Sequence, residues 1–402
     1  MKRFGFLVVV LMMASMIAAC GSLSSVGGSG ETIKIVSSLP RTGSSKGQTD
    51  SIVNAIKQRL EEAQYKACDG TITITYEDLD DATAAAGKWD AAQEASNANK
   101  AAGDADVMVY IGTFNSGAAK ISIPILNQAG IVMVSPANTY PGLTKPGKGD
   151  EGEPDVYYPN GTRNYARVVP ADDLQGAAAA RWAQSLGAKA VYVLDDTELY
   201  GKGIADVFEA TAKELGLDVK GRDGIDGKAA DYRALAAKIV AVAPDLVYYG
   251  GITQNNAGQL IKDVRAEGFK GMIMGPDGIY ETALIEAAGA DAEGVYATFG
   301  GVPAEKLEGD AAKWYADYKA KYNAEPEVYA VYGYEAANVA MNAINSVCKK
   351  DRAAILSAVM GTKDFKGILG TWSFDANGDT SLTAMSGAQV KNGKFEFVQA
   401  IK

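Results

Sequence analysis

The amino-acid sequence predicts an α/β protein made of two doubly wound lobes. From Thr32 onward, short β-branched and apolar runs alternate with amphipathic helical segments, which is typical of parallel strands with helices on both faces of the sheet. The chain has 402 residues, more than one compact core usually contains, so two lobes are expected.

The first thirty residues are predicted to lie outside this fold. Lys2 and Arg3 precede an apolar run at residues 4–17, and small residues then lead to Cys20, which is the pattern of a secretory signal. The run is shorter than the roughly 20 apolar residues of a membrane-spanning helix. Residues 21–30 are rich in Ser and Gly and are expected to form a flexible tether.

The first α/β unit precedes residue 141. Its helices carry one apolar face, as at residues 50–64, where Ile52, Ile56 and Leu60 share a stripe. Its predicted strands are residues 32–38, 71–78, 106–112 and 130–136, and its further helices are residues 88–102 and 116–129.

The pattern restarts after a polar, Gly/Pro-rich insert at residues 141–164, which we expect to be a surface loop near the cleft mouth, anchored by Tyr157 and Tyr158. Strands are predicted at residues 165–170, 190–196, 245–251, 271–277 and 294–300, and helices at 175–187, 203–216, 232–243 and 257–269. The tail predicts helices at residues 311–323, 329–349 and 351–361, then β structure with a hairpin turn at Asn392-Gly393. This mixture favours a chain that crosses back between the lobes.

Polar loops follow two neighbouring strands of the first unit, "TFNSG" at residues 113–117 and "SPANT" at 135–139. In open α/β sheets ligands bind beyond the carboxyl ends of the strands, where a helix N-terminus offers free N–H groups. The hydroxyls of Ser116 and Thr139 could therefore receive a carboxylate. The alternative is that Ser116 only caps its helix and Thr139 only forms a turn.

Polar loops also end strands of the second unit, at residues 195–203, 248–255 and 275–280. Asp277 lies in the last of these and is a candidate partner for an ammonium group; the alternative is a solvated turn carboxylate. The acid pairs at residues 80–81 and 172–173 are predicted to be solvated strand ends and helix caps.

Composition excludes several functions. The chain has no histidine, which excludes a Ser-His-Asp triad and a zinc site that uses histidine. No GxxxxGK[ST] motif occurs, and "GKG" at residues 201–203 does not complete GxGxxG. The net charge of −10, without a Lys/Arg cluster, argues against a nucleic-acid partner. We expect no enzyme, no cofactor and no metal.

Beyond Cys20, the chain has two cysteines, Cys68 and Cys348. An even number in an exported chain is compatible with a disulfide, which would require the two helices that these residues are predicted to end to lie side by side. The alternative is two unpaired thiols.

A series of motifs runs through the mature chain in the order "YIGTFNSGAA", "SPANTYPGLT", "RVVPADDLQG", "LYGKGIADVF", "DLVYYGGITQNNAGQLIKDVRAEGF" and "MGPDGIY". This series resembles the periplasmic branched-chain amino-acid-binding proteins, the substrate-binding subunits of ABC importers. The ending "IAAC" before Gly21 resembles a bacterial lipoprotein signal, in which Cys20 becomes the lipid-bearing N-terminus. The alternative there is an ordinary cleaved signal.

The resemblance implies a type I periplasmic binding protein, with two Rossmann-like lobes that are joined by three crossovers and close on a ligand. It implies a signal peptide at residues 1–19, a lipid anchor and tether at 20–30, an N-terminal lobe at 31–168 plus 298–368, and a C-terminal lobe at 169–297 plus 369–402. The function implied is that of a monomeric, lipid-anchored, extracytoplasmic subunit that binds an amino acid or related zwitterion for an ABC permease. Alternatives are a ligand sensor for a receptor, or a binder of an amide, urea or small aromatic acid.

The resemblance also assigns site residues. Ser116 and Thr139 would bind the α-carboxylate together with backbone groups of Phe114 and Ala137, while Tyr200 would close over the ligand. Asp277 would pair with the α-ammonium in place of the longer Glu of the family. The residues implied to border the side-chain pocket are Asn115, Asn138 and Ile252, with Tyr332 or Tyr334.

Lys46 stands where an aromatic residue is expected in the family. At the pocket rim its charge would favour a polar or acidic ligand side chain. The alternative is a solvated lysine that points away.

Overall fold

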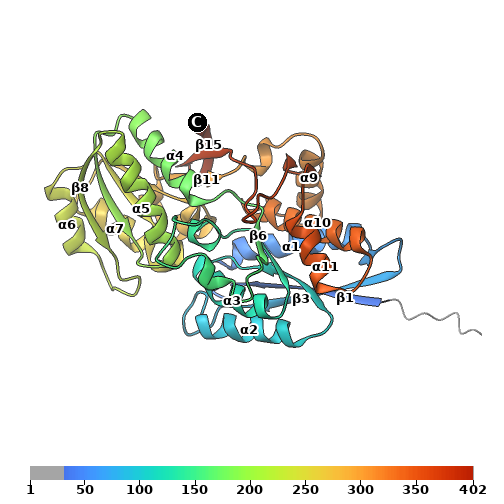
Figure 1. The fold of residues 1–402 in the computed structure, drawn as a ribbon. Helices are drawn as coiled ribbons and strands as arrows, with labels where there is room; N and C mark the ends of the chain where they lie inside the picture. Colours follow the sequence, from blue (N-terminus) through green and yellow to red (C-terminus); the bar gives the residue numbers. More distant parts are fainter. Residues whose placement is uncertain (1–30, 402) are drawn as a thin grey trace, which may run out of the picture. The chain divides into compact units, whose positions relative to one another are not determined.

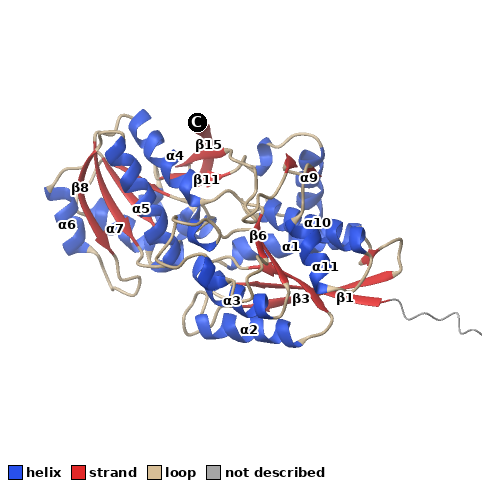
Figure 2. Ribbon diagram, viewed as in Figure 1, coloured by secondary structure: helices blue, strands red, loops and turns tan. Residues whose placement is uncertain are grey.

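The computed structural model describes residues 31–401. Their strands form two large sheets, each flanked by helices, and a small two-stranded sheet (Figures 1 and 2). The predicted signal, Cys20 and the tether lie outside the described residues. Within residues 31–401, no helix combines the length and the apolar character that crossing a membrane requires.

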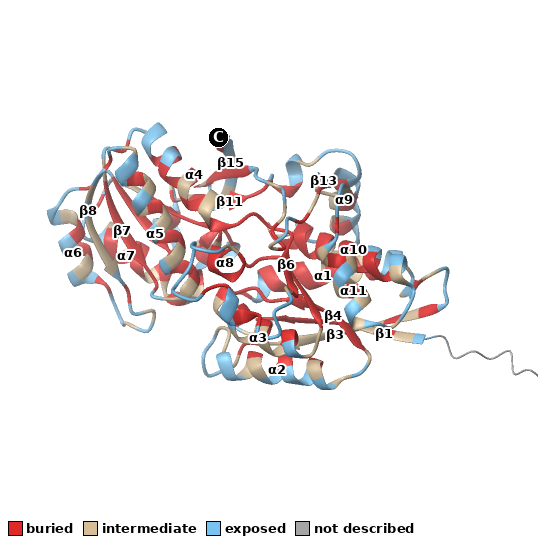
Figure 3. Ribbon diagram, viewed as in Figure 1, coloured by how far each residue is buried: buried red, intermediate tan, exposed pale blue. Residues whose placement is uncertain are grey.

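The first sheet has the strand order β2-β3-β1-β4-β5-β6 and is parallel apart from β2. Its strands are β1 (Glu31–Leu39), β2 (Lys66–Ala67), β3 (Ile72–Asp80), β4 (Val107–Gly112), β5 (Val132–Ser135) and β6 (Tyr165–Arg167). The helices between them are α1 (Lys46–Glu62), α2 (Ala91–Gly103) and α3 (Ser116–Gln128). Strands β4 (labelled in Figure 3) and β5 are buried along their whole length, as expected for central strands covered on both faces.

The second sheet has the order β15-β14-β11-β10-β9-β7-β8. Its strands are β7 (Ala190–Asp195), β8 (Asp218–Gly224), β9 (Leu246–Gly250), β10 (Met272–Gly275), β11 (Tyr296–Gly300), β14 (Met385–Lys391) and β15 (Lys394–Ile401). Its helices are α4 (Asp172–Ser185), α5 (Leu199–Glu214), α6 (Arg233–Ala241), α7 (Ala257–Ala266) and α8 (Thr282–Ala288). Only β14 and β15 run antiparallel to their neighbours, and they form the predicted hairpin at Asn392-Gly393.

The remaining helices return to the first sheet. They are α9 (Asp310–Tyr322), α10 (Ala330–Val347) and α11 (Arg352–Met360), followed by the small sheet of β12 (Phe365–Gly367) and β13 (Gly370–Trp372). Gly333 lets α10 lie close to α1, because a Cβ there would lie 2.7 Å from the backbone oxygen of Ile52. Short 3₁₀ turns occur at Pro141–Leu143 (η1), Asp155–Tyr157 (η2), Thr253–Asn255 (η3), Asp277–Ile279 (η4), Gly289–Ala292 (η5) and Ala304–Lys306 (η6).

The chain passes between the two sheets three times, and the three crossings lie side by side. The first follows β6, the second follows β11, and the third precedes β14. An added Cβ at Gly300 would contact Pro170 at 3.4 Å, and the Gly301 N–H donates to the Ala384 oxygen at 2.8 Å. The α/β fold class with two lobes is thereby confirmed, whereas the predicted lobe boundary between residues 297 and 298 lies inside β11.

The guanidinium of Arg167, at the end of β6, is fully buried and fixes the chain around the first and third crossings. It donates to the Asp379 carboxylate at 2.5 Å and to the backbone oxygens of Asn138 at 3.2 Å and Tyr140 at 2.8 Å. It also donates to the Thr144 hydroxyl, which in turn donates to Asp379. Burial alone would raise the pKa of Asp379, but the Arg167 charge and the hydrogen bonds from Arg167 and Thr144 together outweigh it and hold that pKa below its usual range.

A disulfide joins Cys68 and Cys348, whose Cα atoms are 5.6 Å apart. Cys348 follows the last residue of α10, as predicted. Cys68 does not end a helix; it follows the short strand β2 in a turn with φ of +54°. The bond therefore connects the edge of the first sheet to the returning helix.

Other elements also differ from the prediction made from the sequence, among them β6 and β8. Residues 165–167 form β6 at the edge of the first sheet, although the pattern assigned them to the second unit. Strand β8 was not predicted, because "DVKGRDG" has a single apolar residue and forms a half-exposed edge strand.

We expect Asp379→Asn to lower the free energy of unfolding by about 3–5 kcal/mol at neutral pH, because it leaves the buried Arg167 charge without its counter-ion. Chemical denaturation would measure the loss. Because the folded pKa of Asp379 is depressed, the ion pair stabilises the protein above the ordinary carboxyl pKa near 4, and this contribution disappears as the pH falls through the folded pKa. The exposed Asp364→Asn is the control, with a change of at most ~0.5 kcal/mol; an equal effect of both substitutions would contradict this account.

Candidate ligand-binding site

Side chains from both lobes line a small cavity beyond the carboxyl ends of strands β4, β5, β9 and β10. Its lining residues are Phe114, Asn115, Ser116, Ala137, Thr139, Tyr200, Ile252, Asp277, Gly278 and Tyr329. The enclosed space is about 20 Å³, which is room for one water molecule. A larger ligand would enter only if the lobes or the lining side chains move.

The first lobe contributes hydroxyl, amide and backbone N–H groups. Ser116 is the first residue of α3, whose N-terminal N–H groups have no partner within the helix. The Thr139 hydroxyl and the Asn115 side-chain oxygen are both buried without a hydrogen-bond partner among the described residues. Gly117 allows the Trp89 ring to cover this helix end, because a Cβ there would lie 2.6 Å from the ring.

The loop that carries Thr139 is held in place by bonds to its backbone. The Ser135 hydroxyl accepts the N–H groups of Ala137 and Asn138, at 3.1 and 2.8 Å. The Asn138 amide donates to the Phe114 oxygen at 3.0 Å, which connects this loop to the one after β4. Arg167 donates to the backbone oxygens of Asn138 and Tyr140. Both the N–H groups and the carbonyl groups of this loop are therefore held by hydrogen bonds.

The second lobe contributes a buried carboxyl group, that of Asp277 in η4. It accepts hydrogen bonds from the Tyr200 hydroxyl at 2.8 Å, from the Gln175 amide at 2.5 Å and from the Tyr329 hydroxyl. Burial raises the pKa of Asp277, and the three donors oppose this rise. Tyr329 precedes α10 of the first lobe, so its bond to Asp277 crosses between the lobes.

A second carboxyl group lies beside Asp277. Asp172, at the start of α4, is fully buried, and both its carboxyl oxygens lack a hydrogen-bond partner among residues 31–401. Its backbone N–H donates to the Thr139 oxygen at 2.8 Å. Burial, and then the neighbouring charge of Asp277, raise the pKa of Asp172 well above its usual value. Two acids with raised pKa values next to each other form a site that favours a cation.

Eight of the twelve predicted ligand-site residues line the cavity, and four do not. Asn138 lies behind the lining, in the loop contacts described above. Lys46 forms an ion pair with Asp50 and leaves 57% of its side chain exposed. The Tyr332 hydroxyl donates to the Gly300 oxygen, and that of Tyr334 donates to Glu62.

Three residues that contact or face Asp277 were not predicted from the sequence, namely Tyr329, Asp172 and Gln175. Tyr329 belongs to the same tyrosine-rich run as Tyr332 and Tyr334, but that run gave no register. Asp172 and Gln175 both lie in "ADDLQG", and the prediction that the acids at residues 172–173 and 80–81 are solvated is wrong for Asp172 and Asp81, which are fully buried. The apolar residues around these two acids were the sequence signal that could have indicated their burial.

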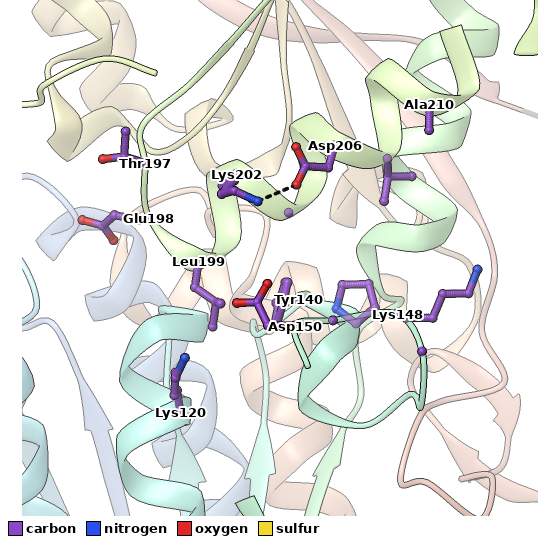
Figure 4. A pocket seen from close by; sticks show the side chains of 15 residues that line it. Lys120, Tyr140, Lys148, Asp150, Thr197, Glu198, Leu199, Lys202, Asp206 and Ala210 are labelled. Carbon is purple, nitrogen blue, oxygen red and sulfur yellow. Dashed lines mark hydrogen bonds and ion pairs between the residues drawn. The ribbon is translucent and has the colours of Figure 1, made fainter. Parts of the chain in front are cut away.

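A larger cavity, of about 540 Å³, lies between the insert at residues 141–164 and helix α5 (Figure 4). Lys202 in its wall is paired with Asp206 at 2.9 Å. Tyr157 and Tyr158 are buried, which confirms them as anchors of the insert. None of its lining residues has a buried polar side-chain atom without a partner, whereas Asn115 and Thr139 of the smaller cavity do, so the smaller cavity is the candidate site.

Known proteins resemble this chain over most of its length. A model of the periplasmic binding protein family matches residues 32–394. Leu/Ile/Val-binding protein homolog 1 of Brucella abortus (strain 2308) is 30% identical over 315 residues, 77% of this chain and 80% of the relative. Homolog 2 of the same strain is 29% identical over 95% of this chain and 98% of the relative. A crystal structure of a leucine-binding protein from Thermotoga maritima MSB8 has a TM-score of 0.81 at 28% identity, covering 92% of this chain and 99% of that one.

We expect Asp172→Asn to raise the free energy of unfolding of the ligand-free protein at neutral pH, because the neutral amide removes a carboxyl whose burial beside Asp277 disfavours its charge. A carboxyl whose folded pKa is raised destabilises the fold at every pH above its unfolded pKa. The gain should therefore vanish as the pH falls toward 4.

Thermal and chemical denaturation between pH 4 and 8 would test this. Asp173→Asn is the matched control, since its neighbouring carboxyl is partly exposed and paired with Lys145. A gain that persisted at pH 4, or that Asp173→Asn reproduced, would count against an unpaired charge at Asp172.

Proposed function

The chain belongs to the branched-chain amino-acid-binding family of periplasmic binding proteins, whose members bind small molecules outside the cytoplasm and are not enzymes, and we propose that it binds an amino acid or related small zwitterion between its lobes for import by an ABC transporter. The observation that carries this proposal is the charge of the cavity. Asp277 lines the cavity, Asp172 is buried next to Asp277, and no cationic side chain is among the lining residues. A ligand ammonium would supply the missing charge.

The opposite end of the cavity suits a carboxylate. The N-terminus of α3 offers backbone N–H groups and a positive dipole end, and the hydroxyls of Ser116 and Thr139 lie beside it. Charge-assisted hydrogen bonds at both ends of a zwitterion, in a site that excludes water, are the strong kind. Few residues could therefore hold the ligand tightly.

Binding would couple to the arrangement of the lobes. The ligand would touch Ser116 and Thr139 on one lobe and Asp277 and Tyr200 on the other, so it would favour the arrangement in which both sets are close. Because the enclosed space is now about 20 Å³, entry would require the lobes or the lining side chains to move and the Tyr329–Asp277 bond to break. An ABC permease would then recognise the liganded form.

The location follows the same proposal. Lipid attachment at Cys20 would anchor a monomer to the cell envelope through the tether at residues 21–30. The described part of the chain would then be the soluble, ligand-binding part, with the permease as its partner in the membrane.

A thermal-shift screen of the purified protein against amino acids tests the proposal. A ligand at 100 times its Kd should add about 2.7 kcal/mol of apparent stability. The affinity of the hit should fall about 100-fold or more in Asp277→Asn, because a buried charge pair is broken. The exposed Asp291→Asn is the control. If the desamino analogue of the hit bound as tightly as the hit itself, the ammonium assignment would be wrong.

A contact outside the cavity should set part of the affinity. Lys88 of the first lobe pairs with Glu198 of the second and donates to the Asn255 oxygen at 2.6 Å, while the Trp89 ring N–H donates to Glu198 at 3.0 Å. These bonds exist only when the lobes are close. Lys88→Ala should weaken ligand binding roughly 3- to 10-fold, equivalent to about 1 kcal/mol for a partly exposed pair.

Isothermal titration of Lys88→Ala against Lys202→Ala would measure this effect. Lys202 forms its ion pair within α5 and therefore does not join the lobes. Equal affinities of the two variants would remove Lys88 from the closure contacts.

A further inference from the structure

Three polar side chains meet where the first lobe faces the second, next to the candidate cavity. They are Gln48 of α1, Gln254 of η3 and Glu281 before α8, and we call them the polar corner. Gln48 and Glu281 are 2% and 3% exposed. Burial of such groups is costly unless each polar atom has a partner.

Four atoms of the polar corner have none among the described residues. They are both amide atoms of Gln48, the Gln254 oxygen and one Glu281 carboxyl oxygen. The single bond within the corner runs from the Gln254 amide to the other Glu281 oxygen, at 2.9 Å. Four such atoms on three neighbouring side chains, where the first lobe faces the second beside the candidate cavity, form a polar site that a ligand could complete.

Contacts around the polar corner bring its members together from both lobes. The Glu327 N–H donates to the Ser51 hydroxyl at 2.9 Å, and the Thr282 hydroxyl donates to the Glu327 carboxylate at 2.8 Å. Ser51 is one helical turn from Gln48, and Thr282 follows Glu281. Burial raises the pKa of Glu281 to about 7, and the hydrogen-bonding groups of Thr253, Gln254 and Gln48 around its carboxyl oppose this rise, so these side chains lie next to one another.

The polar corner adjoins the cavity through two segments. Ile252, which lines the cavity, directly precedes η3, and the Thr253 hydroxyl donates to the oxygen of Gly278, another lining residue, at 3.4 Å. Asp277 lies four residues before Glu281. A ligand held at Asp277 could therefore extend a side chain toward the corner.

The charge of the corner is not offset by the chain. No ion pair joins Glu281 to a lysine or arginine within residues 31–401, and the charge of another acid, Glu327, raises the pKa of Glu281 further. One α-ammonium would be used at Asp172 and Asp277. Glu281, the third buried acid, would therefore be satisfied only by a second hydrogen-bond donor or positive charge on the ligand.

We propose that the polar corner is the side-chain subsite, and that the ligand is an amino acid whose side chain ends in N–H donors, such as an ammonium, a guanidinium or an amide, and not a branched aliphatic group. This proposal rests on the proposed function, because it takes the zwitterion end of the ligand as given. Glu281 accepts the side-chain donor, and Gln48 and Gln254 supply the further polar contacts. A site that pairs buried polar groups discriminates strongly against a ligand that leaves them unpaired.

Isothermal titration of the full protein with arginine, lysine, glutamine, leucine and isoleucine tests the subsite. At least one ligand with side-chain N–H groups should bind 10-fold or more tightly than leucine. Glu281→Gln should lower the affinity for the preferred ligand about 10-fold if its side chain is cationic, and Glu281→Leu should lower it for any donor side chain while it improves leucine binding. The exposed Glu286→Gln in α8 is the matched control.

The outcomes separate this inference from the proposed function. Leucine binding as tight as that of every N–H-bearing ligand would keep the amino-acid site and overturn the subsite. Binding of no amino acid at all would overturn both. A Glu281→Leu variant that is destabilised yet keeps the wild-type ligand preference would also overturn the subsite, since the polar corner would then be a purely structural feature; circular dichroism of each variant separates unfolding from lost binding.

Discussion

A buried positive charge organises the region on which the candidate site depends. Arg167 ends an edge strand of the first sheet and has no access to solvent, so its donors must be satisfied by the protein. Asp379, which supplies the counter-charge, comes from the last passage of the chain between the lobes. Two of the carbonyl groups that accept from Arg167 flank Thr139 in the loop that lines the cavity. The same group thus fixes both a crossing and a wall of the site.

The buried charges at the cleft are negative and, unlike Arg167, have no partner of opposite charge in the described part of the chain. Asp172, Asp277 and Glu281 are buried without a cationic side chain paired to any of them, whereas Asp379 has Arg167. Acids held in this way reduce the stability of the folded chain, and natural proteins tolerate such a cost where function requires it. Buried acids without a counter-ion also occur elsewhere among the described residues, as at Asp81 and Glu94, so it is the position of these three acids at or beside the cavity that favours a ligand site. The attraction of these acids for a cationic ligand group depends on the exclusion of water, since water would screen the same acids on the surface.

Much of the fold followed from patterns in the chain, and the site followed in part. The apolar periodicity predicted the central strands, and the rule that ligands lie beyond strand ends selected Ser116 and Thr139. The burial of individual acids was harder to predict. A carboxyl at a helix start has the sequence pattern of a solvated cap whether it faces water, as Asp173 partly does, or the interior, as Asp172 does. Register within a tyrosine-rich helix start was equally ambiguous, so Tyr329 was missed while Tyr332 and Tyr334 were chosen. Lys46 had a partner, Asp50, one turn away on its own helix, and such pairs are visible in sequence.

The three adjacent crossings have a mechanical consequence. Two bodies joined by one segment can twist and slide as well as bend, but three parallel connections that are bonded to one another, as at Gly301 and Ala384, resist twist and translation. The lobes are left with essentially one coordinate, the angle between them. Binding of a small ligand thereby fixes the angle between the lobes. A partner that contacts the outer surfaces of both lobes can therefore recognise the liganded state without touching the ligand.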